Sequence, residues 1–311
     1  MSIASIFTFR LCSPIRIRQC VAIGLAMGLI VSSARTQTTP RPITIAVLDF
    51  GDTPLGKAVS QRFAASLASI SGISLADPDL VRAAARGAHY RGSLNMSLTE
   101  ARDLGAAIGC DFYVIGDAQT LRRSPSTGPA YFESYASLFV VSARTGKLIS
   151  WERPSFEVTA AEAAERQLLE QLSRDETRRR YLLVIQKAKK DERHEREIAV
   201  ERNTPVIEEV ADETSDDRQS LRPPRPYRRL RPAYPDTAAR AEAEATVDVL
   251  VDLDNQGEVT RVDVARWAGF GLDEATVNTV RQMHFFPAVR DRVAIPIRVL
   301  LRYNFRIPTQ K

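Results

Sequence analysis

The chain has 311 residues, of which 44% are hydrophobic and 26% are charged, and its formal net charge is +5. This composition is typical of a globular protein, and the length allows two or three compact domains. The positive charge is unevenly spread along the chain, so it does not by itself indicate nucleic-acid binding, and we expect no nucleic-acid partner.

Residues 1–40 have the pattern of a secretory signal. Basic residues as far as Arg18 precede an apolar run, Val21–Val31, and small residues lead to an expected cleavage point after Ala34. The run is short for a membrane-spanning helix, which needs about 20 apolar residues. An uncleaved anchor in the inner membrane is the alternative. In either case the rest of the chain crosses that membrane.

Residues 41–157 predict a layered α/β domain. The run Ile43–Phe50 is apolar on both faces, which indicates a strand that is covered on both sides. The other expected elements are a helix over 55–70, a strand over 73–76, a helix from 78, a helix headed by the capping box 97–100, and strands over 112–118, 131–141 and 147–152.

The turn after the first strand resembles a phosphate-binding loop. Gly51–Lys57 has the spacing G-x-x-x-x-G-K and lies between a predicted strand and a predicted helix. The next residue is Ala58, so the hydroxyl that holds magnesium in that motif is missing. We therefore interpret this stretch as an ordinary strand-to-helix turn and expect no nucleotide or other cofactor.

The cysteines and histidines indicate neither a metal site nor an enzyme. Cys110 is the single cysteine after residue 40, so no intramolecular disulfide is expected there, and its expected role is that of a small buried hydrophobic residue. The three histidines stand apart from one another and from cysteine, so no metal-ligand spacing is present. No catalytic constellation is recognisable, and we expect a protein that is not an enzyme.

Residues 158–231 are predicted to connect two domains. A charged helical stretch over 160–201 precedes an acidic run over 208–217, and a proline- and arginine-rich segment, 221–231, follows. We interpret the first as a solvated helix that could dock on the first domain, and the second as a disordered linker. The third reads as an extended spacer with a reach of about 40 Å. The arginines of Arg222–Arg231 offer another interpretation, which is contact with anionic lipid or cell-wall polymer.

Residues 232–311 predict a second domain that begins with a β-hairpin. Apolar residues alternate with polar ones over Thr246–Leu253 and again over Glu258–Ala265. The stretch Asp254–Gly257 between them is typical of a turn. A bulge is expected near Thr260.

A helix and a long last strand complete this domain. The helix begins at Leu272, and apolar residues occupy every second position over Val293–Phe305. Pro296 has no N–H, which places that part of the strand at a sheet edge or a bulge. The expected fold class is α+β, with an N-terminal layered α/β domain, a charged helical and linker region, and a C-terminal β-β-α-β domain with a three-stranded antiparallel sheet.

Several short sequence motifs of the last domain together resemble the TonB C-terminal domain. They are Tyr234-Pro235, the turn ending in Gly257, Gly271-Leu272-Asp273-Glu274-Ala275, Phe286-Pro287-Ala288 and the long last strand. The first domain more weakly resembles envelope domains of the TolB amino-terminal and CsgG-like type, through 45–50, 101–105, 109–116 and 145–148.

The TonB resemblance implies a periplasmic module that grips an extended segment of an outer-membrane TonB-dependent receptor. In that family the segment is added as a strand to the edge of the last strand. The residues implied for this docking edge are Arg298, Val299, Leu300, Leu301, Arg302, Tyr303, Asn304 and Phe305, with Tyr234 and Pro235 fixing how the chain enters the domain and Phe286 and Pro287 bracing the helix. The alternative is that the last strand pairs only within its own sheet.

The resemblance also implies an energy transducer that supports transport across the envelope. The family's anchor helix carries a histidine used in coupling to the inner-membrane proton-motive complex, and Val21–Val31 contains none. Binding is therefore better supported than energy transduction. The alternative function is a structural or assembly protein of the cell envelope.

Overall fold

The computed structural model describes residues 41–201, 208–209 and 221–308. The predicted signal and most of the acidic run lie outside the described residues. No helix within the described ranges is both long enough and apolar enough to cross a membrane.

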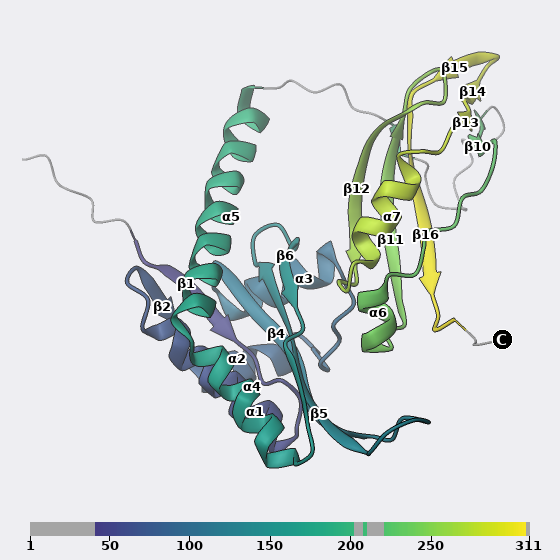
Figure 1. Ribbon diagram of the computed structural model, residues 1–311. Helices are drawn as coiled ribbons and strands as arrows, with labels where there is room; N and C mark the ends of the chain where they lie inside the picture. Colours follow the sequence, from purple (N-terminus) through teal and green to yellow (C-terminus); the bar gives the residue numbers. More distant parts are fainter. Residues whose placement is uncertain (1–40, 202–207, 210–220, 309–311) are drawn as a thin grey trace, which may run out of the picture. The chain divides into compact units, whose positions relative to one another are not determined.

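The first sheet has the strand order β2-β1-β4-β5-β6, with β7 also paired to β5 (Figure 1). Its strands are β1 (Ile43–Val47), β2 (Ile73–Leu75), β4 (Phe112–Arg123), β5 (Tyr131–Ser142), β6 (Leu148–Glu152) and β7 (Ser155–Val158). The helices in the same part of the chain are α1 (Pro54–Ala68), α2 (Pro78–Gly87) and α3 (Leu98–Ile108). β1 runs parallel to β2 and β4, and the remaining pairs are antiparallel.

Two hydrophobic clusters cover the two faces of this sheet. Ile45 packs with residues of α1, whereas its neighbour Ala46 packs with residues of α2 and α3. Because successive side chains of a strand point to opposite faces, the prediction that the first strand is covered on both sides is confirmed. The sequence pattern thus identified an interior strand of the sheet, which lies between β2 and β4.

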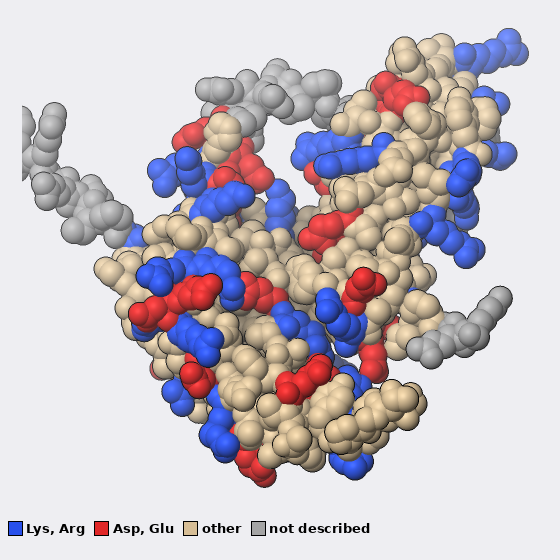
Figure 2. Space-filling view, viewed as in Figure 1, with Lys and Arg blue, Asp and Glu red and all other residues tan. Residues whose placement is uncertain are grey.

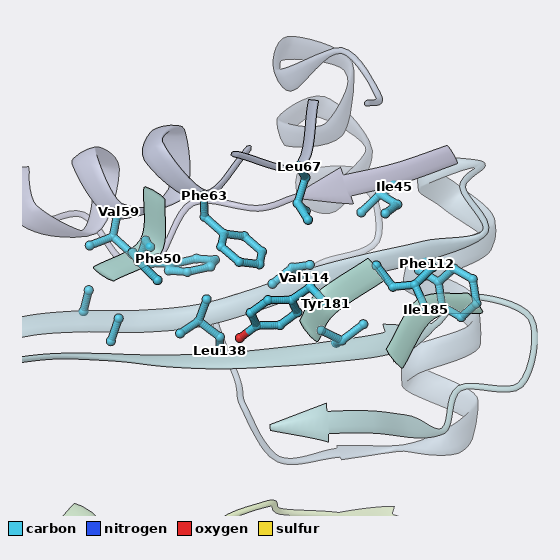
Figure 3. Packing of buried hydrophobic residues seen from close by; sticks show 14 of the residues in the cluster. Ile45, Phe50, Val59, Phe63, Leu67, Phe112, Val114, Leu138, Tyr181 and Ile185 are labelled. Atoms are coloured by element: carbon cyan, nitrogen blue, oxygen red, sulfur yellow. The ribbon is translucent and has the colours of Figure 1, made fainter. Parts of the chain in front are cut away.

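The charged helical stretch forms two helices, α4 (Ala161–Ser173) and α5 (Asp175–Glu201), with Arg174 between them in an extended conformation. Leu168 and Tyr181 are buried in the same cluster as α1. The ring of Tyr181 lies edge-on to Phe63 with a centroid distance of 4.8 Å (Figure 3). The stretch docks on the first domain, as the sequence analysis allowed, but it forms two helices where one was expected, and one side of them is buried in the core instead of solvated.

The glycine that completes the phosphate-loop spacing has a packing role. A Cβ at Gly56 would lie 2.1 Å from the carbonyl oxygen of Phe50. Thr53 caps α1, since its Oγ1 accepts a hydrogen bond from the Gly56 N–H at 2.9 Å. These contacts favour the interpretation as a strand-to-helix turn.

The C-terminal sheet is built on three antiparallel strands, as predicted, and their order is β12-β11-β16. They are β11 (Ala245–Leu253), β12 (Val259–Trp267) and β16 (Ile297–Phe305), and the short strands β3 (Met96–Ser97) and β8 (Glu208–Glu209) extend the sheet at its two edges. Valines of β11 are fully buried with residues of α6 (Asp236–Ala241) and α7 (Leu272–Val280). The register of the hairpin skips Thr260, which confirms the expected bulge.

The predicted last strand is broken at Pro296. The residues before it form β15 (Val293–Ile295), which pairs with β14 (Ala288–Arg290), whereas β16 after it pairs with β11. Proline offers no N–H to a ladder, so the chain leaves one sheet and joins another at this point. The expectation of one continuous strand over Val293–Phe305 was therefore wrong.

The proline- and arginine-rich segment is not an extended spacer. Its β9 (Leu221–Arg222) pairs with β14, and its β10 (Arg225–Pro226) pairs with β13 (Phe285–Phe286). The N–H of Tyr227 also donates to the carbonyl of His284 at 2.9 Å. This part of the chain belongs to the C-terminal domain, which corrects the prediction from its composition.

Two residues that the sequence analysis did not select, Asn95 and Trp267, link segments of the first domain to the C-terminal sheet. The Asn95 side-chain amide donates to the carbonyls of Thr246 at 2.8 Å and Trp267 at 2.7 Å. The indole N–H of Trp267 donates to the carbonyl of Gly146 at 2.9 Å. Strand pairing of Met96–Ser97 with β12 adds to these contacts.

Candidate partner-binding edge

The described residues pair fully with one edge of β16 and at only two positions with its other edge. Its inner edge pairs with β11 over nine positions, from Ala245 opposite Phe305 to Leu253 opposite Ile297. Its outer edge pairs with β8 at two positions, Ile297 and Arg298. No strand among the described residues pairs with the outer edge of 299–305. Backbone N–H and C=O groups there are thus left for a further strand.

Side chains on the two faces of this strand differ in chemistry. Val299, Leu301 and Tyr303 are half-buried and pack against the domain core. On the other face Leu300 is 53% exposed. Its neighbours on that face, Arg302 and Asn304, are exposed as well. A strand added at this edge would meet one largely apolar face and one mixed, solvated face.

Two arginines of the predicted docking edge are bound to buried carboxylates of β11. Arg302 donates to both carboxylate oxygens of Asp248, at 2.7 and 3.0 Å. Arg298 makes the equivalent pair of bonds to Asp252. Asp248 is 5% exposed and Asp252 is 3% exposed. Hydrogen bonding to Asp248 raises the pKa of Arg302. These two arginines therefore also stabilise the sheet.

This pairing was missed from the sequence, although a signal was present. Two aspartates four residues apart on one strand face two arginines four residues apart on its antiparallel neighbour. Residues separated by four share a strand face, so the two spacings are complementary.

Tyr234 and Pro235 make contacts within the domain. The hydroxyl of Tyr234 donates to the carbonyl of Ala243 at 2.9 Å, and its ring lies 6.4 Å from that of Phe305. Pro235 precedes α6 as its N-terminal cap residue. Both residues fix the start of the domain, and their predicted role in partner binding stays a prediction.

Phe286 is 56% exposed and packs on Tyr227, with a centroid distance of 4.2 Å. The sequence analysis expected Phe286 to brace the helix, but its ring packs on Tyr227 instead of on α7. The buried residue at this place is Phe285, which is 2% exposed. Adjacent strand residues point to opposite faces, so a one-residue difference decides which aromatic ring enters the core.

Titratable groups near the sheet indicate structural roles. No group of three His, Cys, Asp or Glu within the described ranges could hold a metal ion. Burial raises the pKa of Cys110 to about 12, so its thiol stays protonated near neutral pH.

Asp273 makes the stability of the C-terminal domain depend on pH. Burial raises its pKa from 3.8 to about 6, although the N–H groups of Gly269 and Ala268 donate to its carboxylate. Between about pH 4 and pH 6, the Asp273 carboxyl is ionised in the unfolded chain but protonated in the folded chain. The folded state therefore binds more protons, so this residue favours folding more strongly as pH falls. From about pH 7 to about pH 5, we expect the wild type to gain about 1 kcal/mol relative to Asp273→Asn.

Urea unfolding of both proteins at several pH values measures this difference. All other acidic groups are the same in the two proteins, so their effects cancel in the comparison. A difference that stays constant with pH, or that shrinks as pH falls, would contradict the expectation.

Comparison with known proteins identifies the last domain. Residues 231–307 match the family described as the C-terminal domain of the Gram-negative bacterial TonB protein. No curated protein matches the chain.

Solved structures similar to parts of the chain include three from different bacteria. The Pseudomonas aeruginosa TonB C-terminal domain is 18% identical, covers 34% of this chain and 100% of its own, and has a TM-score of 0.26. Lipoprotein GNA1162 from Neisseria meningitidis is 15% identical, with coverage of 37% and 83% and a TM-score of 0.27. The PelC dodecamer from Paraburkholderia phytofirmans is 11% identical, with coverage of 42% and 85% and a TM-score of 0.26.

Proposed function

We propose that this chain, whose residues 231–307 form a domain of the TonB C-terminal family, is a periplasmic adaptor that holds an extended segment of an outer-membrane receptor. The segment would be added to the sheet as a strand beside β16. The observation that carries the proposal is that no strand among the described residues pairs with the outer edge of 299–305. The family is non-enzymatic, which agrees with a binding role.

Backbone pairing would supply most of the affinity at this edge. Successive N–H groups along a strand point alternately toward one neighbour and the other, so about half of those in 299–305 face outward. Each hydrogen bond formed adds about 1 kcal/mol net. The exposed Leu300 and Arg302 would select the side chains on one face of the added strand, whereas backbone groups accept any sequence.

A pair of proline variants tests the edge. Leu300 and Leu301 are adjacent, so the N–H of one faces β11 and that of the other faces outward. Proline at the outward position removes a donor to the guest strand and leaves the ladder with β11 intact. We expect this variant to melt like the wild type and to lose binding of a receptor's extended N-terminal peptide, measured by fluorescence polarisation.

The second proline variant should melt at a lower temperature, and this identifies which residue faces inward. Leu300→Ser is the control for the side chain, because it keeps the backbone N–H. Wild-type peptide affinity in the proline variant that keeps its melting temperature would contradict the proposal. The last strand would then pair only within its own sheet.

A structural or assembly protein of the envelope is the second candidate function. It is favoured by the pairing of β9 and β10 within the C-terminal domain, because the expected spacer for crossing the periplasm is then absent from 221–231. The missing histidine in Val21–Val31 also weighs against coupling to the proton-motive complex. The resemblance of the first domain to TolB amino-terminal and CsgG-like domains fits this role as a prediction.

Cell fractionation with intact-mass measurement of the N-terminus separates the two functions. A transducer requires the N-terminal helix to be retained in the inner membrane. Cleavage after Ala34 favours the assembly role.

A further inference from the structure

A positively charged surface covers the end of the C-terminal domain formed by β9, β10 and β13–β15. We call it the arginine surface. Its exposed arginines are Arg222, Arg225, Arg228, Arg229, Arg231 and Arg292. Figure 2 shows Lys and Arg gathered over this side of the domain. The guanidinium groups of these six residues form no ion pair with any other described residue.

Large apolar side chains are exposed on the same elements. Tyr227 is 59% exposed, Phe286 is 56% exposed and Val293 is 62% exposed. Arg225 lies opposite Phe286 in the β10–β13 pair, and Val293 begins the strand that follows Arg292. Exposed aromatic and aliphatic residues among arginines mark an interaction site.

Backbone pairing holds this surface in place. Residues on both sides of Tyr227 are tied to the domain, through the β10–β13 pair and through the packing of Leu230 on the domain core. Hence the arginines and aromatic rings do not have to be ordered when a partner binds, and less conformational entropy is lost.

We propose that the arginine surface docks on an anionic lipid bilayer. Guanidinium groups that no described carboxylate pairs with attract acidic headgroups, and each cation near such a membrane contributes to binding. The exposed apolar side chains distinguish a lipid surface from a charged glycan, because Tyr and Phe settle at the boundary between headgroups and acyl chains. Arg225 and Phe286 lie on the β10–β13 pair, which is not part of the sheet that contains β16. Arg229, by contrast, is near enough to Tyr303 of β16 to favour its ionised form.

Vesicle sedimentation tests the proposal with residues 41–311, which form a compact unit without the apolar N-terminal run. We expect binding to vesicles that contain phosphatidylglycerol, little binding to pure phosphatidylcholine, and weaker binding as salt is added. The double variant Arg225→Glu/Arg228→Glu should lower the partition coefficient about tenfold or more. Phe286→Ser, which leaves the charge unchanged, should also lower it.

A matched control makes the same change in net charge at a place outside the arginine surface. Lys57 and Arg62 are exposed on α1, so Lys57→Glu/Arg62→Glu should reduce vesicle binding far less than the variant of the arginine surface. Equal losses in the two double variants would overturn the proposal, since only total charge would then matter. Wild-type binding by Phe286→Ser, or retention on purified cell-wall polymer without binding to vesicles, would also overturn it.

Discussion

Trp267→Ala is expected to lower the free energy of unfolding by about 3–5 kcal/mol, the usual cost of removing a buried tryptophan. The side chain is 1% exposed, and its ring stacks on Phe139 with a centroid distance of 6.0 Å. Its N–H bond to Gly146 is lost as well, which leaves a buried carbonyl without this partner. Urea unfolding followed by circular dichroism measures the change.

The variant should also separate the unfolding of the two sheets into two transitions, because Trp267 lies in β12 and both Phe139 and Gly146 belong to the first domain. Trp267→Phe is the matched control. It keeps a stacked ring and loses the N–H, so we expect a smaller loss, of about 1–2 kcal/mol. An alanine variant that unfolds in one transition at the wild-type midpoint would refute the role given to this contact.

Arg298→Ala is expected to cost about 2–3 kcal/mol, because it leaves the carboxylate of Asp252 buried without its bidentate partner. The estimate lies below the range for fully buried pairs, since the Arg298 side chain is 30% exposed. Arg302→Ala should cost only about 1 kcal/mol. Its side chain is 60% exposed, and Arg266 lies 3.6 Å from the same carboxylate of Asp248.

The double variant Arg298→Leu/Asp252→Leu tests the mechanism. Removing both charges leaves no uncompensated carboxylate, so stability should return most of the way to that of the wild type. The single variants Arg298→Leu and Asp252→Leu, the double variant and the wild type form a thermodynamic cycle, and the free energy of unfolding of each is measured. A double variant as unstable as Arg298→Ala would show that packing of the arginine stem, and not its charge, supports the sheet.

Local patterns predicted the elements that local forces determine. Alternating valines in β11 and the capping box at Ser97 lie where the sequence placed them, because burial of one face and satisfaction of helix-end N–H groups depend on neighbouring residues. The same is true of the Asp254–Gly257 turn. A Cβ at Gly257 would lie 1.9 Å from the carbonyl oxygen of Phe285.

Long-range pairing is what the sequence pattern could not reveal. Segment 221–231 reads as a polar spacer because proline and arginine disfavour a buried strand, yet two short β-pairs tie it to residues about 60 positions later. Met96–Ser97 shows no strand period at all, since two residues are too few to display one.

The docking edge could be predicted from the sequence only in part. Periodicity identified β16 and its two faces, whereas the pairing of its outer edge, which the described strands occupy at only two positions, depends on distant parts of the chain. Arg298 and Arg302 were selected for binding, and the structure adds a structural role through Asp252 and Asp248 that their spacing alone encoded.

The nine-position ladder between β11 and β16 determines how this sheet would respond to a pulling force. Its hydrogen bonds lie perpendicular to the strands, so tension along β16 loads them all together, whereas a pull across the sheet breaks them one after another. A guest strand lying parallel to this ladder would resist tugging along its own length in the same way, and would peel away readily when lifted from one end.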